Sequence, residues 1–169
     1  MKFKTSILFL ALAAAAAAQQ SNAYLFVAPG AAIGGSSDVS TLHVGVGADI
    51  MIARVFGANV EIGALGPSRD LSAVRGVFSP GATYYFRHGN ELRFEPFVAG
   101  GYSLMFRGGN DSLAYFGGGV NCWFARTTGV RLELRDHYLP APCNGCTDAH
   151  FVGFRIALAL RRPHYESHL

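Results

Sequence analysis

The most informative shortage in this 169-residue sequence is lysine. The only two lysines, Lys2 and Lys4, lie at the N-terminus, and the other basic residues, histidine aside, are twelve arginines. Water-exposed sheet surfaces usually carry lysine, whereas arginine is preferred where a charge must be enclosed and paired through its planar guanidinium group. An arginine-biased genome would give the same pattern. The shortage therefore supports enclosed charges without establishing them.

Charge of any kind and long apolar runs are also scarce. Charged residues make up 15% of the chain and hydrophobic residues 50%, which is too apolar for a disordered protein. Beyond the N-terminus no run of about 18 apolar residues occurs, which excludes a helical membrane protein. Without the two N-terminal lysines, twelve arginines against eleven acids leave a net charge of +1, which gives no electrostatic case for nucleic-acid binding.

The N-terminal residues 1–23 read as a cleavable signal peptide. Two lysines precede an Ala-rich apolar stretch over 7–18, and Ser21-Asn22-Ala23 supplies the small-x-small pattern that signal peptidase reads. Cleavage is expected before Tyr24, with a cut after Ala18 as the alternative. The apolar stretch is short for a retained membrane anchor. The chain is therefore expected to leave the cytoplasm.

The segment from Gly129 to Tyr138 separates two environments on opposite faces of one strand. Side chains of a strand alternate with a period of two. One face carries Val130, Leu132 and Leu134, and the other carries Arg131, Glu133, Arg135 and His137. A helix would scatter both sets around its axis. The segment is therefore predicted to be a strand with one apolar and one ionic face.

Eight segments of the chain alternate in this way or nearly so. Most are about ten residues or longer, which is the length a tilted strand needs to cross a bilayer, whereas strands of soluble sandwiches are nearer five or six. Short and longer connections alternate, and none is long enough for a helical crossover, so the pairing should be antiparallel. Pro80 is a departure, because proline cannot donate to a ladder. The segments are 24–33, 42–52, 55–65, 77–87, 92–106, 113–124, 129–138 and 150–161.

The face that carries the charges also carries most of the glycines, which indicates that it points inward. Eight strands enclose an interior barely wide enough for side chains, and glycine makes room there for a few large groups. Acids and arginines occur on this face in similar numbers, and enclosed charges must be paired. A solvated polar face is the alternative. The candidate lumen charge network is Asp49, Glu61, Arg93, Glu95, Arg131, Glu133, Arg135 and Arg155.

These features resemble those of small bacterial outer-membrane β-barrels of the OmpA-like or OmpX-like type. The resemblance covers Tyr24 to Leu160 and rests on the signal peptide, the eight segments, GGGVNCWF at 117–124 and VRLELRDH at 130–137. It implies an eight-stranded barrel with periplasmic termini and surface loops. It also implies contact with outer-membrane lipid and with the barrel-assembly machinery. OmpA-like members hold a lumenal charge cluster, for which the matching positions are Glu61, Glu95, Arg131, Glu133 and Arg135.

The C-terminus departs from that family pattern. Family members usually end on an aromatic residue that closes the last strand and that the assembly machinery reads. Here the last predicted strand ends near Leu160, and a short tail over 162–169 follows. The predicted organisation is therefore a signal peptide over 1–23, a barrel over 24–161 and this tail.

Cys143 and Cys146 lie in the last long loop and are candidates for a disulfide. Exported proteins meet an oxidising compartment, and the intervening Asn-Gly favours a tight turn. A redox-active pair would need a helix N-terminus to lower its thiol pKa, and none is expected there. Zinc held by these cysteines with His137 and His150 is an alternative, although the spacing matches no standard signature. Cys122 is the third cysteine and is expected to face lipid.

No catalytic arrangement is recognisable in the sequence. Asp136 and His137 are neighbours on a strand, so they point to opposite faces and cannot form a dyad. The loop serines Ser36, Ser68 and Ser112 are not placed beside a histidine. No enzyme activity, cofactor or resident metal is therefore expected.

The sequence predicts an all-β, eight-stranded antiparallel up-and-down transmembrane barrel in a bacterial outer membrane, preceded by a signal peptide. Its lumen is expected to be filled by side chains, and its role to be structural or surface-interacting through loops whose partner the sequence does not name. The alternatives are a soluble secreted barrel that binds an apolar ligand and a narrow small-solute channel.

Overall fold

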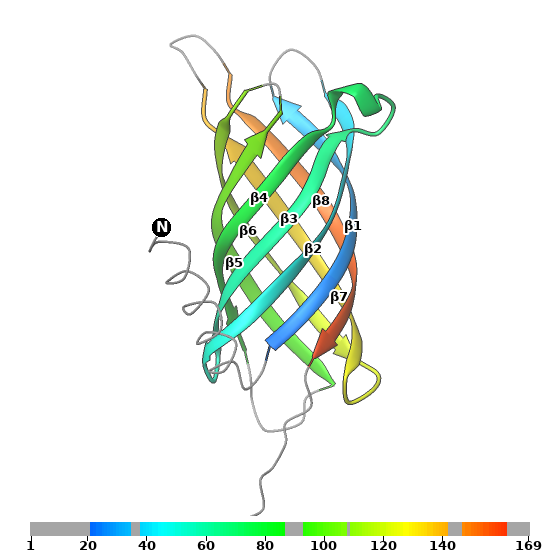
Figure 1. The fold of residues 1–169 in the computed structure, drawn as a ribbon, viewed down its shortest axis with the longest axis vertical. Coiled ribbons are helices and arrows are strands. Elements are labelled where there is room, and N and C mark those ends of the chain that lie inside the picture. The colour runs from blue at the N-terminus through cyan, green and yellow to red at the C-terminus, as the bar shows by residue number, and fades with distance from the viewer. Residues whose placement is uncertain (1–20, 35–37, 87–92, 108, 142–146, 162–169) are drawn as a thin grey trace, which may run out of the picture.

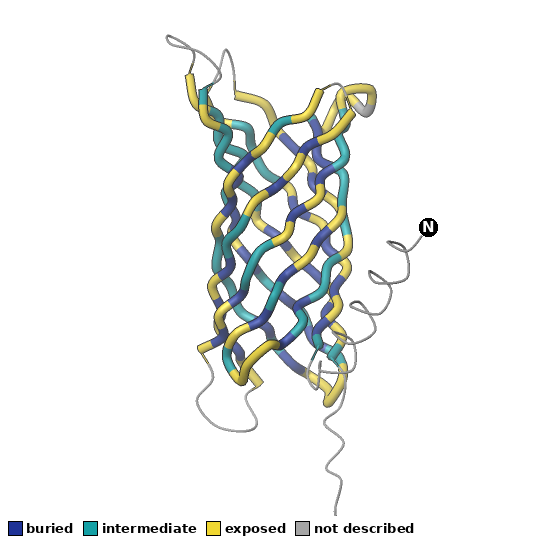
Figure 2. The backbone as a smooth tube through the Cα atoms, turned by 60° about the vertical axis from the view of Figure 1, so that its left-hand side comes forward, coloured by how far each residue is buried: buried dark blue, intermediate teal, exposed yellow. Residues whose placement is uncertain are grey.

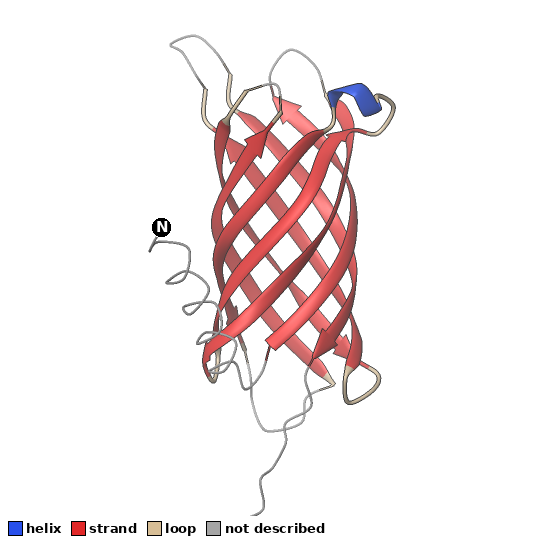
Figure 3. Ribbon diagram, in the orientation of Figure 1, coloured by secondary structure: helices blue, strands red, loops and turns tan. Residues whose placement is uncertain are grey.

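The chain forms a closed barrel of eight strands, each paired with its neighbours in sequence and the last with the first (Figures 1 and 3). The computed structural model describes residues 21–34, 38–86, 93–107, 109–141 and 147–161. The strands are β1 (Ser21–Gly34), β2 (Val39–Ala53), β3 (Phe56–Pro67), β4 (Arg75–Tyr85), β5 (Phe94–Phe106), β6 (Asp111–Trp123), β7 (Thr128–Leu139) and β8 (Ala149–Arg161). All eight pairings are antiparallel.

The barrel has two distinct ends. At the terminus end, β1 begins, β8 ends, and the β2–β3, β4–β5 and β6–β7 connections lie (Figure 1). At the loop end lie the other four connections, one of which carries the short 3-10 helix η1 (Leu71–Ala73). No helix among the described residues is long and apolar enough to span a membrane.

Buried and exposed residues alternate along most of every strand (Figure 2). On β7, Leu134 is 58% exposed whereas its strand neighbour Glu133 is 1% exposed. Because the buried positions hold charged and polar residues together with apolar ones, and the exposed wall is aliphatic or aromatic, the molecule reverses the arrangement of a soluble barrel. This observation argues against the alternative of a soluble barrel with an apolar ligand inside.

Two prolines interrupt the pairing of the strands that hold them. The β4–β5 pairing skips Ser79 and Pro80, and the β1–β8 pairing skips Ala28 and Pro29. Each proline is still paired on its other side, to Val60 for Pro80. A strand tolerates proline where only one ladder loses its donor. Pro80 is thus accommodated within β4.

Six of the eight strands are longer than the sequence predicted, mainly at the loop end, whereas β4 has the predicted length and β5 is two residues shorter. β2 begins at Val39, where the prediction began at 42, and β6 begins at Asp111, where it began at 113. β1 begins at Ser21, within the predicted signal peptide, and Asn22 is buried and pairs with Asp49. The rest of the predicted signal peptide and the tail over 162–169 lie outside the described residues.

Candidate functional site in the lumen

Six buried charges of alternating sign form a continuous chain across the barrel interior. Arg131 Nη1 lies 2.8 Å from Asp49 Oδ2, and Arg131 Nε lies 3.0 Å from Glu133 Oε2. Arg135 contacts Glu133 through Nε and Glu61 through Nη1, the latter at 2.7 Å. The chain ends at Arg155, whose Nη1 lies 2.7 Å from Glu61 Oε1. Three cations and three anions therefore compensate one another inside the barrel.

One strand supplies half of this chain. The successive inward positions of β7 hold Arg131, Glu133 and Arg135. Because every second residue of a strand faces the same side, a positive, a negative and a positive group follow one another along the inner wall. Asp49 comes from β2 and Glu61 from β3, on the other side of the lumen. The chain thus ties opposite walls of the barrel together.

Neutral polar side chains satisfy the remaining oxygens of Asp49. Its Oδ1 accepts hydrogen bonds from Asn59 Nδ2 at 2.7 Å and from the Thr83 hydroxyl at 3.1 Å. Its Oδ2 accepts a hydrogen bond from the Tyr85 hydroxyl in addition to the one from Arg131. A buried carboxylate requires such a complete set of donors.

A second set of neutral groups connects Glu61 to the far wall. The Tyr24 hydroxyl donates to Glu61 Oε1 at 2.6 Å and accepts from Asn59 Nδ2 at 2.7 Å. Asn59 in turn accepts from the Tyr115 hydroxyl at 3.0 Å. The acids are therefore embedded in a shared hydrogen-bond network whose members depend on one another.

Aromatic rings cover the faces of the three guanidinium groups. The Arg131 guanidinium carbon lies 3.7 Å from the centre of the Phe97 ring, and that of Arg155 lies 3.8 Å from the centre of Phe26. Arg135 lies over Tyr115 at 4.4 Å. These cation–π contacts replace water on the planar faces, which form no hydrogen bonds.

Glycine makes room for the two tyrosines that reach into the network. A Cβ atom at Gly47 would lie 2.6 Å from the Tyr24 ring, and one at Gly81 would overlap the Tyr115 hydroxyl. Real Cβ atoms do not approach other atoms so closely, and the rings cannot retreat in a packed interior. The glycines on the inward face are therefore part of the site.

Apolar side chains pack together inside the barrel on both sides of the charges. The upper apolar cluster, near the loop end, and the lower apolar cluster, near the terminus end, each join inward residues of several strands. The upper cluster is Leu65, Val77, Met105 and Leu113, with Leu139 and Phe151 packed against it. The lower cluster is Met51, Tyr85, Phe97 and Ala99.

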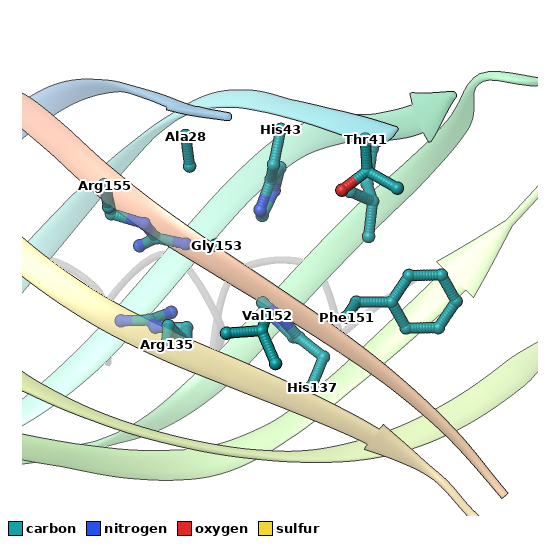
Figure 4. A pocket seen from close by; sticks show the side chains of 10 residues that line it. Ala28, Thr41, His43, Arg135, His137, Phe151, Val152, Gly153 and Arg155 are labelled. Carbon is teal, nitrogen blue, oxygen red and sulfur yellow. The ribbon is translucent and has the colours of Figure 1, made fainter. Parts of the chain in front are cut away.

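A small cavity lies between the charges and the upper apolar cluster (Figure 4). His43 and His137 line it with Arg135 and Arg155, and the two imidazole rings meet edge to face at 5.7 Å. Its volume is about 10 Å³, near the minimum for one water molecule. Among the described residues, Arg135 Nη2, Arg155 Nε and His137 Nε2 have no hydrogen-bond partner. The cavity can therefore hold a single water and no larger ligand.

The structure brings six of the eight predicted network residues into the chain of ion pairs. Glu95 is also buried, but it lies closer to the terminus end, where it accepts hydrogen bonds from Asn121 and Trp123. The prediction for Arg93 is wrong, because this residue is exposed. Arg93 precedes the first residue of β5. The alternation in the sequence therefore extends to an inward-type position that lies beyond the end of the strand, outside the barrel wall.

The other sequence candidates are not brought together. Cys143 and Cys146 lie outside the described residues. His137 is buried in the lumen, whereas His150 is on the outer wall with its Nδ1 2.7 Å from Asp136 Oδ2, so one zinc ion cannot bind both histidines. Among the described residues no cluster suited to a metal ion is present.

The sequence interpretation missed the Asp136–His150 pair and the inward aromatic residues. The pair joins β7 to β8 diagonally, so it depends on register, which the sequence leaves open. Tyr24 and Phe26 alternate along β1 with Leu25 and Val27, which are exposed. This alternation could have placed both aromatic rings inside the barrel.

Solved structures of small outer-membrane barrels share the fold of this chain. Neisserial surface protein A matches with a TM-score of 0.61 and 11% identity, over 83% of this chain and 96% of that one. The N-terminal β-barrel domain of OprF from Pseudomonas aeruginosa matches with a TM-score of 0.58 and 13% identity, over 83% and 97%. The chain has the fold of the small outer-membrane β-barrels. This confirms the predicted eight-stranded antiparallel transmembrane barrel.

A third small outer-membrane barrel extends the comparison. Ail, the attachment invasion locus protein of Yersinia pestis, matches with a TM-score of 0.59 and 9% identity, over 85% of this chain and 98% of that one. No protein-family model and no curated protein matches the sequence. At identities this low the likeness establishes the fold of the barrel and leaves its role to be argued from the site.

Proposed function

We propose that this outer-membrane barrel has a lumen sealed by side chains and serves a structural or surface-interaction role without catalysis. The observation that carries the proposal is the six-charge chain, which joins Asp49 and Glu61 on one wall to β7 on the other. Ions that cross the lumen would have to break pairs that are at most 2% exposed. The apolar clusters on either side add two further barriers to hydrated solutes.

The exterior supports an outer-membrane location. Exposed side chains such as Leu25, Ile62, Leu134 and Ile156 form an apolar outer wall, which is unfavourable in water and which the acyl chains of a bilayer would cover. Exposed aromatic residues lie close to the strand ends, among them Phe56, which suits the two interfaces of a membrane. The compartment and the bacterial outer membrane as destination are part of this proposal.

The loop end is the proposed interaction surface. Ail is named for attachment and invasion, and Neisserial surface protein A for its surface location, and both share the barrel. In this chain the lumen charges are occupied in mutual pairing, so they are not free to act on a substrate. Recognition therefore falls to the connections at the loop end.

Cell fractionation and conductance test the two halves of the proposal separately. The protein should sediment with membranes and require detergent for release, and recovery in a soluble fraction without detergent would reject the membrane location. In planar bilayers the purified barrel should give no steady current. Large, persistent ion currents would instead support the narrow-channel alternative and reject a sealed lumen.

A further inference from the structure

Exposed charge is divided unequally between the two ends of the barrel. Among the described residues, the terminus end carries arginines and no exposed acid, whereas the loop end carries both signs. The arginines of the terminus end are Arg54, Arg93, Arg126 and Arg161. The loop end has Arg69, Arg75 and Arg107 with Asp38, Asp70, Asp111 and Asp148. The terminus end is therefore the only cationic end in the described part of the chain.

These four residues, here called the arginine ring, are distributed around the barrel. Arg54 lies in the β2–β3 connection, Arg93 just before β5, Arg126 in the β6–β7 connection and Arg161 at the end of β8. Each strand connection at this end thus contains at least one arginine in the sequence, and the closing strand contributes another. A single macromolecular partner would favour a patch on one side, whereas a ring suits a surface that surrounds the barrel.

Exposed aromatic residues lie next to the ring on the outer wall. Phe56 follows Arg54 by two residues, Phe94 follows Arg93, and Phe124 precedes Arg126 by two residues, and all three rings point outward. Aromatic residues of a membrane barrel occupy the interface, and arginines just beyond it extend toward the headgroups. In an embedded barrel this repeated pairing would bring the three arginines close to the lipid phosphates.

At Arg93 and Arg126 the local contacts are made by the backbone carbonyl oxygens and not by the side chains. The carbonyl of Arg93 accepts a hydrogen bond from the Trp123 N–H at 2.8 Å, and the carbonyl of Arg126 accepts one from Arg161 Nε at 2.8 Å. The Arg161 guanidinium also lies over the Trp123 ring at 4.4 Å. Substituting the side chain of Arg93 or Arg126 therefore leaves these contacts in place.

We infer that the arginine ring binds the phosphates of anionic phospholipids in the leaflet that surrounds the terminus end. Guanidinium groups match phosphate oxygens geometrically and remain charged at an interface. Each arginine near an anionic bilayer surface contributes roughly a five-fold preference for that surface. The inference rests on the proposed membrane location, because it assigns the lipid class that this end of the embedded barrel selects.

Native mass spectrometry of the folded full-length protein in nonionic detergent tests the inference. The barrel is offered equal amounts of phosphatidylglycerol and phosphatidylcholine with the same acyl chains, and the ratio of bound lipids is measured. The wild type should prefer phosphatidylglycerol, and Arg93→Gln with Arg126→Gln should reduce that preference by roughly ten-fold or more. The matched control, Arg69→Gln with Arg107→Gln at the loop end, should keep it.

Three outcomes would overturn the inference. The wild type could show no preference, both double variants could lose it equally, or soluble polyglutamate could compete as well as phosphatidylglycerol, which would indicate an acidic protein partner.

Folding is verified by heat-modifiable gel mobility, and the single variants repeat the comparison if the double variant does not fold. Insertion into pure phosphatidylcholine vesicles is measured alongside. Insertion without lipid preference rejects the ring alone, whereas failure of the wild type to insert rejects the membrane location.

Discussion

The lumen and the loop end each contain arginine–carboxylate ion pairs, but the pairs differ in their exposure to water. Arg131 and Glu133 are 1% and 0% exposed in their side chains, and each has a second charged partner in the lumen. Arg75 and Asp111 at the loop end are 26% and 40% exposed and pair with each other beside water. Water can solvate Arg75 or Asp111, here called the rim pair, if its partner is removed, whereas a buried lumenal charge that loses its partner has little access to water.

This difference shows where ion pairs specify the structure. Removing charges from water is unfavourable, and their attraction repays it only when geometry and additional hydrogen bonds are good. In the lumen the charges alternate in sign along the chain of ion pairs. Tyrosine and asparagine side chains donate further hydrogen bonds to the carboxylates, and aromatic rings cover the guanidinium groups. The lumenal pairs therefore require one another, and the rim pair is dispensable.

Glu133→Gln should have the largest effect, because Glu133 lies between Arg131 and Arg135 in the chain. The variant leaves an uncompensated positive charge in the lumen, for which we expect a loss of about 3–5 kcal/mol in the free energy of unfolding. Urea unfolding in lipid vesicles measures it, with fluorescence of Trp123, the single tryptophan, as the signal. Asp111→Asn is the matched rim control. A loss below about 1 kcal/mol for Glu133→Gln would mean that the pairs are solvated.

The charge chain could be predicted largely because one strand encodes it. Arg131, Glu133 and Arg135 occupy alternate positions in the sequence, so their shared face follows from strand geometry alone. The inward direction followed from the glycines on the same face and from the arginine bias. The fold was therefore accessible from periodicity, without any long-range contact being known.

The partners of these residues were not accessible in the same way. Which acid meets Arg131 depends on the register and shear of the closed sheet, and Asp49 is 82 residues away in the chain. Arg93 shows the complementary error, since alternation does not mark where a strand ends. The apolar clusters were missed because Leu65 and Val77 look like ordinary strand residues.

Gly47→Ala should cause the second largest loss in the free energy of unfolding. The added methyl group would meet the Tyr24 ring, whose hydroxyl bonds to Glu61 and Asn59. Overpacking of this kind is expected to reduce stability by about 1–3 kcal/mol. Gly100→Ala is the control, because a Cβ there has one neighbour at 3.4 Å. Equal unfolding midpoints for the two variants would show that the tyrosine shifts without loss.

The rim pair should contribute much less than the lumenal chain. A double-mutant cycle with Arg75→Ala and Asp111→Ala is expected to give a coupling energy of about 0.2–1 kcal/mol, because the pair is partly exposed. Raising the salt concentration to 1 M should abolish most of it, since exposed charges are screened. A coupling as large as the effect of Glu133→Gln, or one insensitive to salt, would contradict the contrast between the two regions.

Asp70 at the loop end is expected to contribute least to the stability of the barrel. The hydroxyl and the backbone N–H of Ser72 donate to its carboxylate at 2.6 and 2.9 Å, and these bonds hold the pKa of Asp70 below its ordinary value. A lowered pKa means that the contribution to stability is present above the unfolded pKa and is lost as the pH falls through the folded pKa. Because Asp70 is fully exposed, that contribution should be too small to detect in unfolding. Ser72→Ala should therefore raise the pKa of Asp70 in an NMR titration while leaving the unfolding midpoint at neutral pH unchanged. An unaltered titration would show that the turn does not hold the carboxylate, and a shifted midpoint would show that exposed rim contacts stabilise this barrel after all.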